Sequence, residues 1–135
     1  MTNRVLITGA SSGIGAQLAI QYSKASLELI LIARRKEKLE AVKYKCLEKN
    51  PNLKVSLFLG NVDNFDFLDS IAKHYETKHE WINTVIANAG IGVSGKFSDL
   101  QIDDFKNQFD TNIYGVLHTA CLLYTSDAAD EEDSV

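Results

Sequence analysis

The stretch from Val5 to Gly15, VLITGASSGIG, constrains this chain more than any other part of its sequence. A short apolar run typical of a buried strand leads into a turn with Gly9, Gly13 and Gly15, and an apolar repeat with helical spacing follows. Glycine permits the sharp turn and lets a phosphate group approach the backbone without meeting a Cβ atom. Because the spacing is G-x-x-x-G-x-G rather than G-x-G-x-x-G, the pattern alone also fits a glycine-rich turn without a ligand.

Strand-like and helix-like segments alternate along the chain with almost no linker. Apolar runs predict four strands, at residues 5–7, 27–33, 53–59 and 81–87. Amphipathic repeats after the strands predict four helices, with apolar stripes within residues 14–22, 39–47, 68–75 and 105–116. Repeated strand-helix units form parallel strands with right-handed crossovers. The units therefore predict an open α/β sheet with helices on both faces. The fold class we expect is α/β, a Rossmann-type doubly wound parallel sheet that is incomplete; in this type of fold the first four strands have the order 3-2-1-4.

Charge and cysteine content exclude several classes of protein. The formal net charge is -4, but five of the 18 acidic residues lie in the last nine positions, and no Lys or Arg follows Lys106. The rest of the chain is nearly neutral, which argues against nucleic-acid or membrane-surface partners. Cys46 and Cys121 have no Cys or His at metal-ligand spacing, so we expect no metal site and a reducing, cytoplasmic compartment. We see no secretion signal and no membrane-spanning run.

Three motifs resemble those of the short-chain dehydrogenase/reductase family. Thr8–Gly15 resembles its cofactor motif, Ala87–Gly90 resembles its N-N-A-G motif with the first Asn replaced, and Asp110–Asn112 resembles the segment that holds its catalytic Asn. The resemblance covers residues 1 to about 120 and implies the N-terminal, cofactor-binding half of a truncated member. It implies cofactor contacts from Gly9, Ser11, Ser12, Gly13, Ile14, Gly15, Asn88, Ala89 and Gly90.

The same resemblance implies a catalytic role for Asn112. In the family this Asn kinks its helix and holds a water molecule in the proton relay. Taken without the resemblance, the residue also fits a solvated or capping amide, because such side chains often bond to nearby backbone.

The turn after the second expected strand bears on the choice of cofactor. It reads Ala33-Arg34-Arg35-Lys36, with no acid to accept hydrogen bonds from the ribose hydroxyls of NAD. A guanidinium group matches phosphate oxygens in bidentate fashion, so Arg34, supported by Arg35 and Ser11, favours NADP over NAD. A solvated basic loop at a helix start is the alternative.

A departure from the family pattern follows the third expected strand. The family has an Asp-Val pair there, and its Asp meets the adenine amine, whereas this chain has Asn61-Val62. An Asn side-chain oxygen can still accept that hydrogen bond, so we expect Asn61 and Val62 to contact the cofactor and adenine to bind more weakly.

The resemblance implies an NADP-dependent oxidoreductase that moves hydride between NADP(H) and a small carbonyl or alcohol substrate, in a parent protein that forms a homo-oligomer. In the family the proton comes from the Tyr of a Tyr-x-x-x-Lys motif, whose pKa the Lys lowers, and a Ser holds the substrate oxygen. Tyr124 does not replace that Tyr, because Ala128 stands where the Lys belongs. We therefore expect this chain by itself to be inactive. A non-enzymatic dinucleotide-binding sensor or scaffold on the same fold is the alternative function.

The end of the chain changes character at Cys121. Back-translated, residues 121–130 can be written in codons that resemble a transposase adapter used in sequencing libraries. Our hypothesis is that residues 1–120 belong to a single Rossmann dinucleotide-binding domain and that residues 121–135 are a non-native tail of translated adapter. A genuine acidic disordered tail is the alternative, and its composition permits that.

Overall fold

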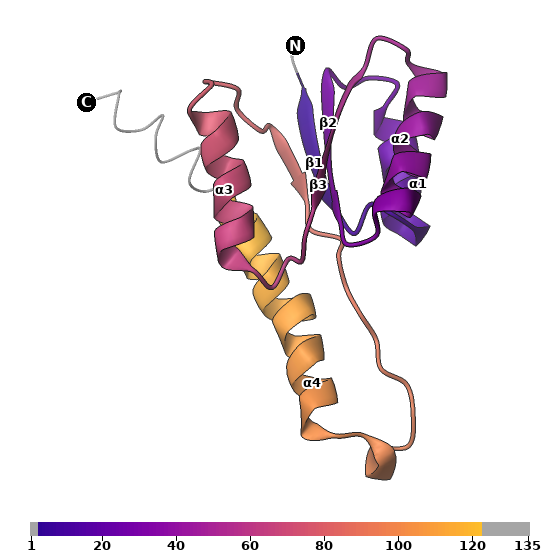
Figure 1. The fold of residues 1–135 in the computed structure, drawn as a ribbon, viewed down its shortest axis with the longest axis vertical. Helices are drawn as coiled ribbons and strands as arrows, with labels where there is room; N and C mark the ends of the chain where they lie inside the picture. The colour runs from indigo at the N-terminus through magenta and orange to yellow at the C-terminus, as the bar shows by residue number, and fades with distance from the viewer. Residues whose placement is uncertain (1–2, 123–135) are drawn as a thin grey trace, which may run out of the picture.

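The computed structural model describes residues 3–122, and its centre is a parallel β-sheet of four strands (Figure 1). The order β3-β2-β1-β4 confirms the predicted topology. Leu6 in the first strand is level with Ile30 in the second and Val85 in the fourth, so the carboxyl ends of the strands meet at one edge of the sheet. The strand bounds are β1 Arg4–Thr8, β2 Glu28–Ala33, β3 Lys54–Leu59 and β4 Thr84–Ile86.

Helices cover both faces of the sheet, with α1 and α2 on one face and α3 and α4 on the other (Figure 1). Alternate residues of a strand point to opposite faces. In β1, Val5 and Ile7 pack in the core beneath α1 and α2, whereas Leu6 packs in the core beneath α3. This two-sided burial explains why β1 and β2 are continuous apolar runs in the sequence. The helix bounds are α1 Gly13–Tyr22, α2 Lys36–Lys49, α3 Phe65–Glu76 and α4 Ile102–Phe109.

Strand β4 is shorter than the predicted run at residues 81–87. The side-chain oxygen of Asn83 accepts a hydrogen bond from Arg4 N at 2.8 Å, and Asn83 N donates to Arg4 O at 3.0 Å. Because a side chain takes the place of a main-chain acceptor there, the regular ladder begins only at Thr84.

The fourth helical segment contains a change of winding that the sequence pattern did not predict. Helix α4 ends at Phe109, the π-helix η2 spans Asp110–Tyr114, and the chain is α-helical again over residues 115–122. A π turn adds a residue and rotates the face that packs against the protein. The buried positions are therefore Thr111, Gly115, Thr119 and Leu122.

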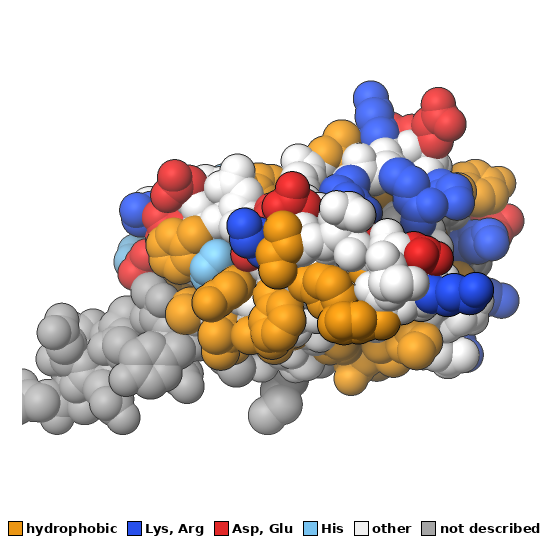
Figure 2. Space-filling view, turned by 90° about the horizontal axis from the view of Figure 1, so that it is seen from below, with side chains coloured by type: hydrophobic (Ala, Val, Ile, Leu, Met, Phe, Trp, Pro, Cys, Tyr) orange, Lys and Arg blue, Asp and Glu red, His pale blue; other side chains and the backbone are white. Residues whose placement is uncertain are grey.

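The predicted apolar stripe of this segment lies mostly at the surface. Phe109 is 54% exposed, Ile113 44% and Val116 37%, and Phe97 in the short 3-10 turn η1 (Phe97–Asp99) is 83% exposed. Seen from below the view of Figure 1, hydrophobic side chains gather beside a group of Lys and Arg side chains (Figure 2). The hydrophobic part of this surface is not covered by any described residue.

Most of the tail predicted for residues 121–135 lies outside the described residues. Within residues 3–122, Leu122 is 4% exposed and packs in the core beside α3. The helices of this part of the chain include none that is both long enough and apolar enough to cross a membrane.

A charged residue, Glu28, is fully buried at the amino end of β2. Its Oε1 accepts hydrogen bonds from Ser56 Oγ and Tyr75 Oη, both at 2.7 Å, and its Oε2 lies 3.1 Å from Lys54 Nζ and 3.3 Å from Arg4 Nε. Burial alone would raise the pKa of this carboxyl, but the hydrogen bonds and the Lys54 charge together hold the pKa below its usual value of 4.5. Each oxygen has partners, which makes a carboxylate tolerable at this depth.

We expect Glu28→Gln to lower the free energy of unfolding by about 2 kcal/mol at neutral pH, because it removes the charge that Arg4 and Lys54 face. Folding lowers the pKa of Glu28, so its contribution is complete above the usual pKa of 4.5 and is lost as the pH falls through the folded-state pKa. Urea unfolding of both proteins, from neutral pH into acid, should show a difference that narrows below pH 4.5.

Glu48→Gln is the matched control. Glu48 is exposed near the end of α2 and makes no ion pair within residues 3–122. This variant should differ from the unsubstituted chain by no more than about 0.5 kcal/mol at every pH. An equal loss in both variants would contradict the role assigned to Glu28.

Candidate functional site

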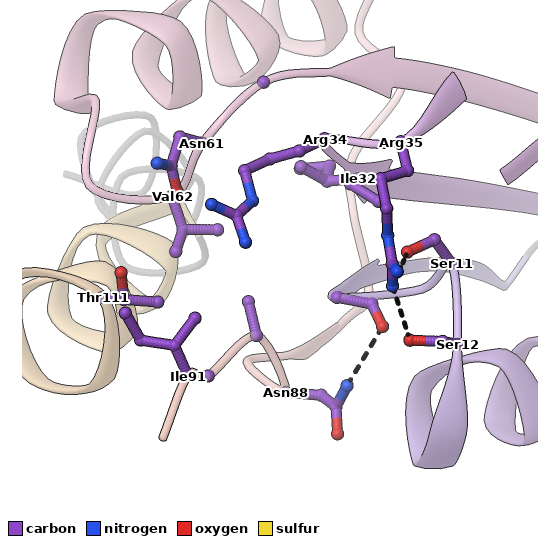
Figure 3. A pocket seen from close by; sticks show the side chains of 15 residues that line it. Ser11, Ser12, Ile32, Arg34, Arg35, Asn61, Val62, Asn88, Ile91 and Thr111 are labelled. Atoms are coloured by element: carbon purple, nitrogen blue, oxygen red, sulfur yellow. Dashed lines mark hydrogen bonds between the residues drawn. The ribbon is translucent and has the colours of Figure 1, made fainter. Parts of the chain in front are cut away.

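A pocket of about 200 Å³ opens at the carboxyl ends of the strands, where the segments after β1, β2, β3 and β4 come together (Figure 3). The strand order reverses at β1, because the chain first moves outward to β2 and β3 and then returns to β4 on the other side. Open α/β sheets bind ligands at such a reversal. The described lining residues are Gly9, Ser11, Ser12, Ile32, Ala33, Arg34, Arg35, Gly60, Asn61, Val62, Asn88, Ala89, Gly90, Ile91 and Thr111.

The turn from β1 to α1 has no room for side chains at two of its glycines. Gly9 has φ +65°, and a Cβ built on it would lie 2.8 Å from Ala89 Cα. A Cβ on Gly15 would overlap the carbonyl oxygen of Gly9. This tight approach brings the start of α1 to the pocket edge. The first N–H groups of a helix have no intrahelical partner, so the turn offers donors and a positive dipole end to an anion.

Thr8 and Asn88 join this turn to the loop after β4. Thr8 Oγ1 accepts hydrogen bonds from the backbone N–H groups of Asn88 and Ala89, both at 3.0 Å. Asn88 Nδ2 donates to Thr8 O at 3.1 Å and lies 3.4 Å from Gly9 O. The two segments therefore form one rigid wall of the pocket.

Arg34 and Arg35 follow β2 and direct their guanidinium groups to different places (Figure 3). Arg35 Nη2 donates to Ser12 Oγ at 3.0 Å and lies 3.5 Å from Ser11 Oγ. Arg34 extends across the pocket and has no hydrogen-bond or ion-pair partner within residues 3–122. Asp and Glu are missing from the described lining residues, so the lining includes two positive side chains and no acidic one.

Asn61 and Val62 lie on the far side of the pocket from the β1–α1 turn (Figure 3). Asn61 is half-buried, and Val62 is only 3% exposed. Thr111 and Ile91 complete this side of the pocket. This side of the pocket therefore offers the apolar side chain of Val62 next to the amide of Asn61, which can donate and accept hydrogen bonds.

Asn112 makes a reciprocal pair of hydrogen bonds with the loop after β4. Its Oδ1 accepts from Ile91 N, and its Nδ2 donates to Ile91 O, both at 2.8 Å. The residue lies in the π-helix η2, at the change of winding that the family resemblance implied. In the described structure its side chain therefore holds the loop that carries Gly90 and Ile91.

Three predicted cofactor residues do not line the pocket. Gly13 and Ile14 line a separate hollow between α1 and α2, and Gly15 is buried beneath the turn. The Ile14 side chain is 73% exposed. A cofactor contact by these three residues stays a prediction that rests on backbone N–H groups at the start of α1.

Sequence reasoning missed five lining residues. Ile32 and Ala33 end a predicted strand, where pocket residues of α/β sheets are found, and Gly60 follows the next strand directly. A Cβ on Gly60 would overlap the ring of Phe67, so this glycine also permits a close approach. Ile91 lies in the loop after β4 that Asn112 bonds twice, and Thr111 reaches the pocket from η2. These residues are Ile32, Ala33, Gly60, Ile91 and Thr111.

A family model described as short chain dehydrogenase matches residues 3–130. Dehydrogenase/reductase SDR family member 7 of Mus musculus is 38% identical over 125 residues, which cover 88% of this chain and 36% of that protein. The 11-beta-hydroxysteroid dehydrogenase-like 2 of Arabidopsis thaliana is 37% identical over 116 residues, which cover 82% of this chain and 36% of that protein.

Solved structures of short-chain and alcohol dehydrogenases are also similar to this chain. A short-chain type dehydrogenase/reductase from Mycobacterium marinum has a TM-score of 0.81 at 28% identity, covering 90% of this chain and 48% of that chain. An alcohol dehydrogenase from Thermococcus sibiricus, complexed with 5-hydroxy-NADP, has a TM-score of 0.82 at 25% identity, and the match covers 93% of this chain and 53% of that chain. The chain thus spans between about a third and about a half of the length of the proteins to which it is similar.

We expect Asn112→Ala to loosen the loop after β4, because it removes both hydrogen bonds to Ile91. Each hydrogen bond contributes about 1 kcal/mol, so the loss of both should make amide hydrogen exchange at Ile91 at least about tenfold faster. Asn112→Asp keeps the acceptor but loses the donor, and should be intermediate.

Asn107→Ala is the control on the same helix. Asn107 is exposed, and its side chain makes no hydrogen bond within the described residues. Exchange at Ile91 should be unchanged in this variant. The assignment fails if Asn107→Ala accelerates exchange as much as Asn112→Ala does.

Proposed function

The chain belongs to the short chain dehydrogenase family, and we propose that its pocket binds NADP(H) for an oxidoreductase that transfers hydride between this cofactor and a carbonyl or alcohol substrate. Hydride transfer is proposed for the whole protein, since this chain spans only part of its relatives. Cofactor binding is proposed for the chain itself.

One observation carries the choice of NADP, the guanidinium of Arg34. It lies in the pocket without a partner among the described residues, directly after β2, where ribose recognition takes place in this kind of fold. A 2′-phosphate would give this charge a partner, and Arg35, which already bonds Ser11 and Ser12, would add a second charge. The Thermococcus sibiricus enzyme, which is complexed with 5-hydroxy-NADP, is a supporting parallel.

The remaining pocket residues fit the other parts of a dinucleotide. Because Gly9 and Gly15 carry no Cβ, the β1–α1 turn packs directly against Ala89 and the Gly9 carbonyl, and the start of α1 lies at the pocket edge. The backbone N–H groups there can meet a pyrophosphate. Asn61 offers an acceptor for the adenine amine, and Val62 an apolar surface for the ring. Asn88 and Ala89 hold the wall between these two regions.

When bound, the nicotinamide supplies or accepts the hydride. Asn112 is proposed to hold the loop after β4 in place beside the cofactor site and to position a water molecule in the proton relay. Its two hydrogen bonds to Ile91 support the first role directly. A small carbonyl or alcohol substrate would approach over that loop.

Two further features of the whole protein are proposals of the same kind. A cytoplasmic location is consistent with the buried thiol of Cys46, whose pKa burial raises to about 11. Such a thiol stays neutral and unreactive. The exposed apolar side chains of α4 are compatible with a homo-oligomer.

We expect Arg34→Ala to weaken NADPH binding to the 135-residue chain by at least about tenfold while NADH binding changes little, because a charge-assisted hydrogen bond is worth about 1.5–3 kcal/mol. Nucleotide fluorescence titration measures both affinities. Arg35→Ala should show a smaller loss, since its guanidinium also bonds Ser11 and Ser12.

Lys24→Ala serves as the charge-matched control. Lys24 is exposed after α1 and is not among the lining residues. Its removal should leave both affinities unchanged. Equal losses of affinity for NADPH and NADH in Arg34→Ala would contradict recognition of the 2′-phosphate. If the unsubstituted chain binds neither nucleotide, the proposed function is overturned.

A further inference from the structure

Val62 lies in a space that exists only because residue 115 is glycine. A Cβ built on Gly115 would stand 2.6 Å from Val62 Cγ2 and 3.3 Å from Val62 Cβ. The side chain of Val62 is 3% exposed, and it lines the pocket beside Asn61 (Figure 3). Any larger residue at position 115 must therefore displace either the helix or this wall of the pocket.

The next turn of the helix holds the backbone of the same residue. His118 Nδ1 lies 3.3 Å from Val62 O, and its ring packs edge to face on Phe65, with 5.2 Å between ring centres. The tautomer with a proton on Nδ1 donates to this carbonyl. Gly115 accommodates the Val62 side chain and His118 bonds the Val62 carbonyl, so two successive turns of helix set the position of Val62.

The helix itself is poorly able to yield at Gly115. The Gly115 N–H donates to Asp110 O across the π turn, and Gly115 O accepts a hydrogen bond from the buried Thr119 hydroxyl at 2.7 Å. Asn112 in the same turn is bonded twice to Ile91. A Cβ at position 115 would thus push on the Val62 side chain before it moved the helix.

From these contacts we infer that Gly115 is a positioning residue for the base-binding end of the nucleotide pocket and acts through Val62. The inference rests on the proposed function, because it assigns to Val62 the apolar surface on which the adenine ring packs. Gly115 is not among the described lining residues. Its effect reaches the ligand through one side chain.

Substitution of Gly115 by Ala tests the inference in the 135-residue chain. We expect Gly115→Ala to lower the affinities for NADPH and for adenosine 2′,5′-bisphosphate by the same factor, about tenfold, because both ligands use the base-binding end. Ala is the better helix former, so the helix itself is not weakened by the change. Isothermal titration measures both affinities, and thermal unfolding without ligand reports stability separately.

A second background separates positioning from general packing. In Val62→Ala the atom nearest the added Cβ is gone, so adding Gly115→Ala there should change affinity by no more than about twofold. Gly92→Ala is the matched control, because a Cβ at exposed Gly92 meets nothing within 4 Å. If Gly115→Ala alone unfolds the chain, the double variant is compared with Val62→Ala.

The outcomes distinguish the two proposals. Unchanged nucleotide affinity in Gly115→Ala, or the same tenfold loss in both backgrounds, overturns the positioning role and leaves the proposed function standing. If the unsubstituted chain binds neither ligand, the proposed function is overturned, and the inference falls with it. A tenfold loss that disappears in the Val62→Ala background supports both.

Discussion

The close approach of the β1–α1 turn to the loop after β4 is the constraint on which the site depends. Gly9 lies against Ala89 and Gly15 against the Gly9 carbonyl, in spaces that admit no Cβ. The Thr8 hydroxyl and the Asn88 amide close the remaining gap with hydrogen bonds. Because these segments cannot separate without losing those bonds, the start of α1 is held at the sheet edge, where its backbone donors can meet an anion.

The helical segment after β4 supplies the opposite wall. It crosses the carboxyl ends of the strands and contacts two loops at once, Ile91 through Asn112 and Val62 through Gly115. The π turn of η2 lies between these contacts. Such a turn changes which residues face inward, and this allows one helix to engage both loops.

Stability and binding are placed at opposite ends of the same sheet. At the amino ends of the strands, the buried carboxylate of Glu28 is surrounded by Arg4, Lys54, Ser56 and Tyr75. At the carboxyl ends, Arg34 has no partner among the described residues. A charge whose partners are all present stabilises the fold, whereas a charge left without one is available to a ligand.

The sequence by itself determined the elements and their order. Apolar periodicity predicted the strands and helices, alternation predicted the parallel sheet, and the turns at Gly9 and Arg34 indicated residues that line the pocket, because these signals are local along the chain. Only the tertiary structure decided how far β4 extends, that the helix kink implied at Asn112 is a π turn, and that Thr111 lines the pocket while Gly115 packs against Val62. Those features depend on contacts between residues far apart in the chain, such as Gly115 with Val62, and close packing in three dimensions selects such contacts.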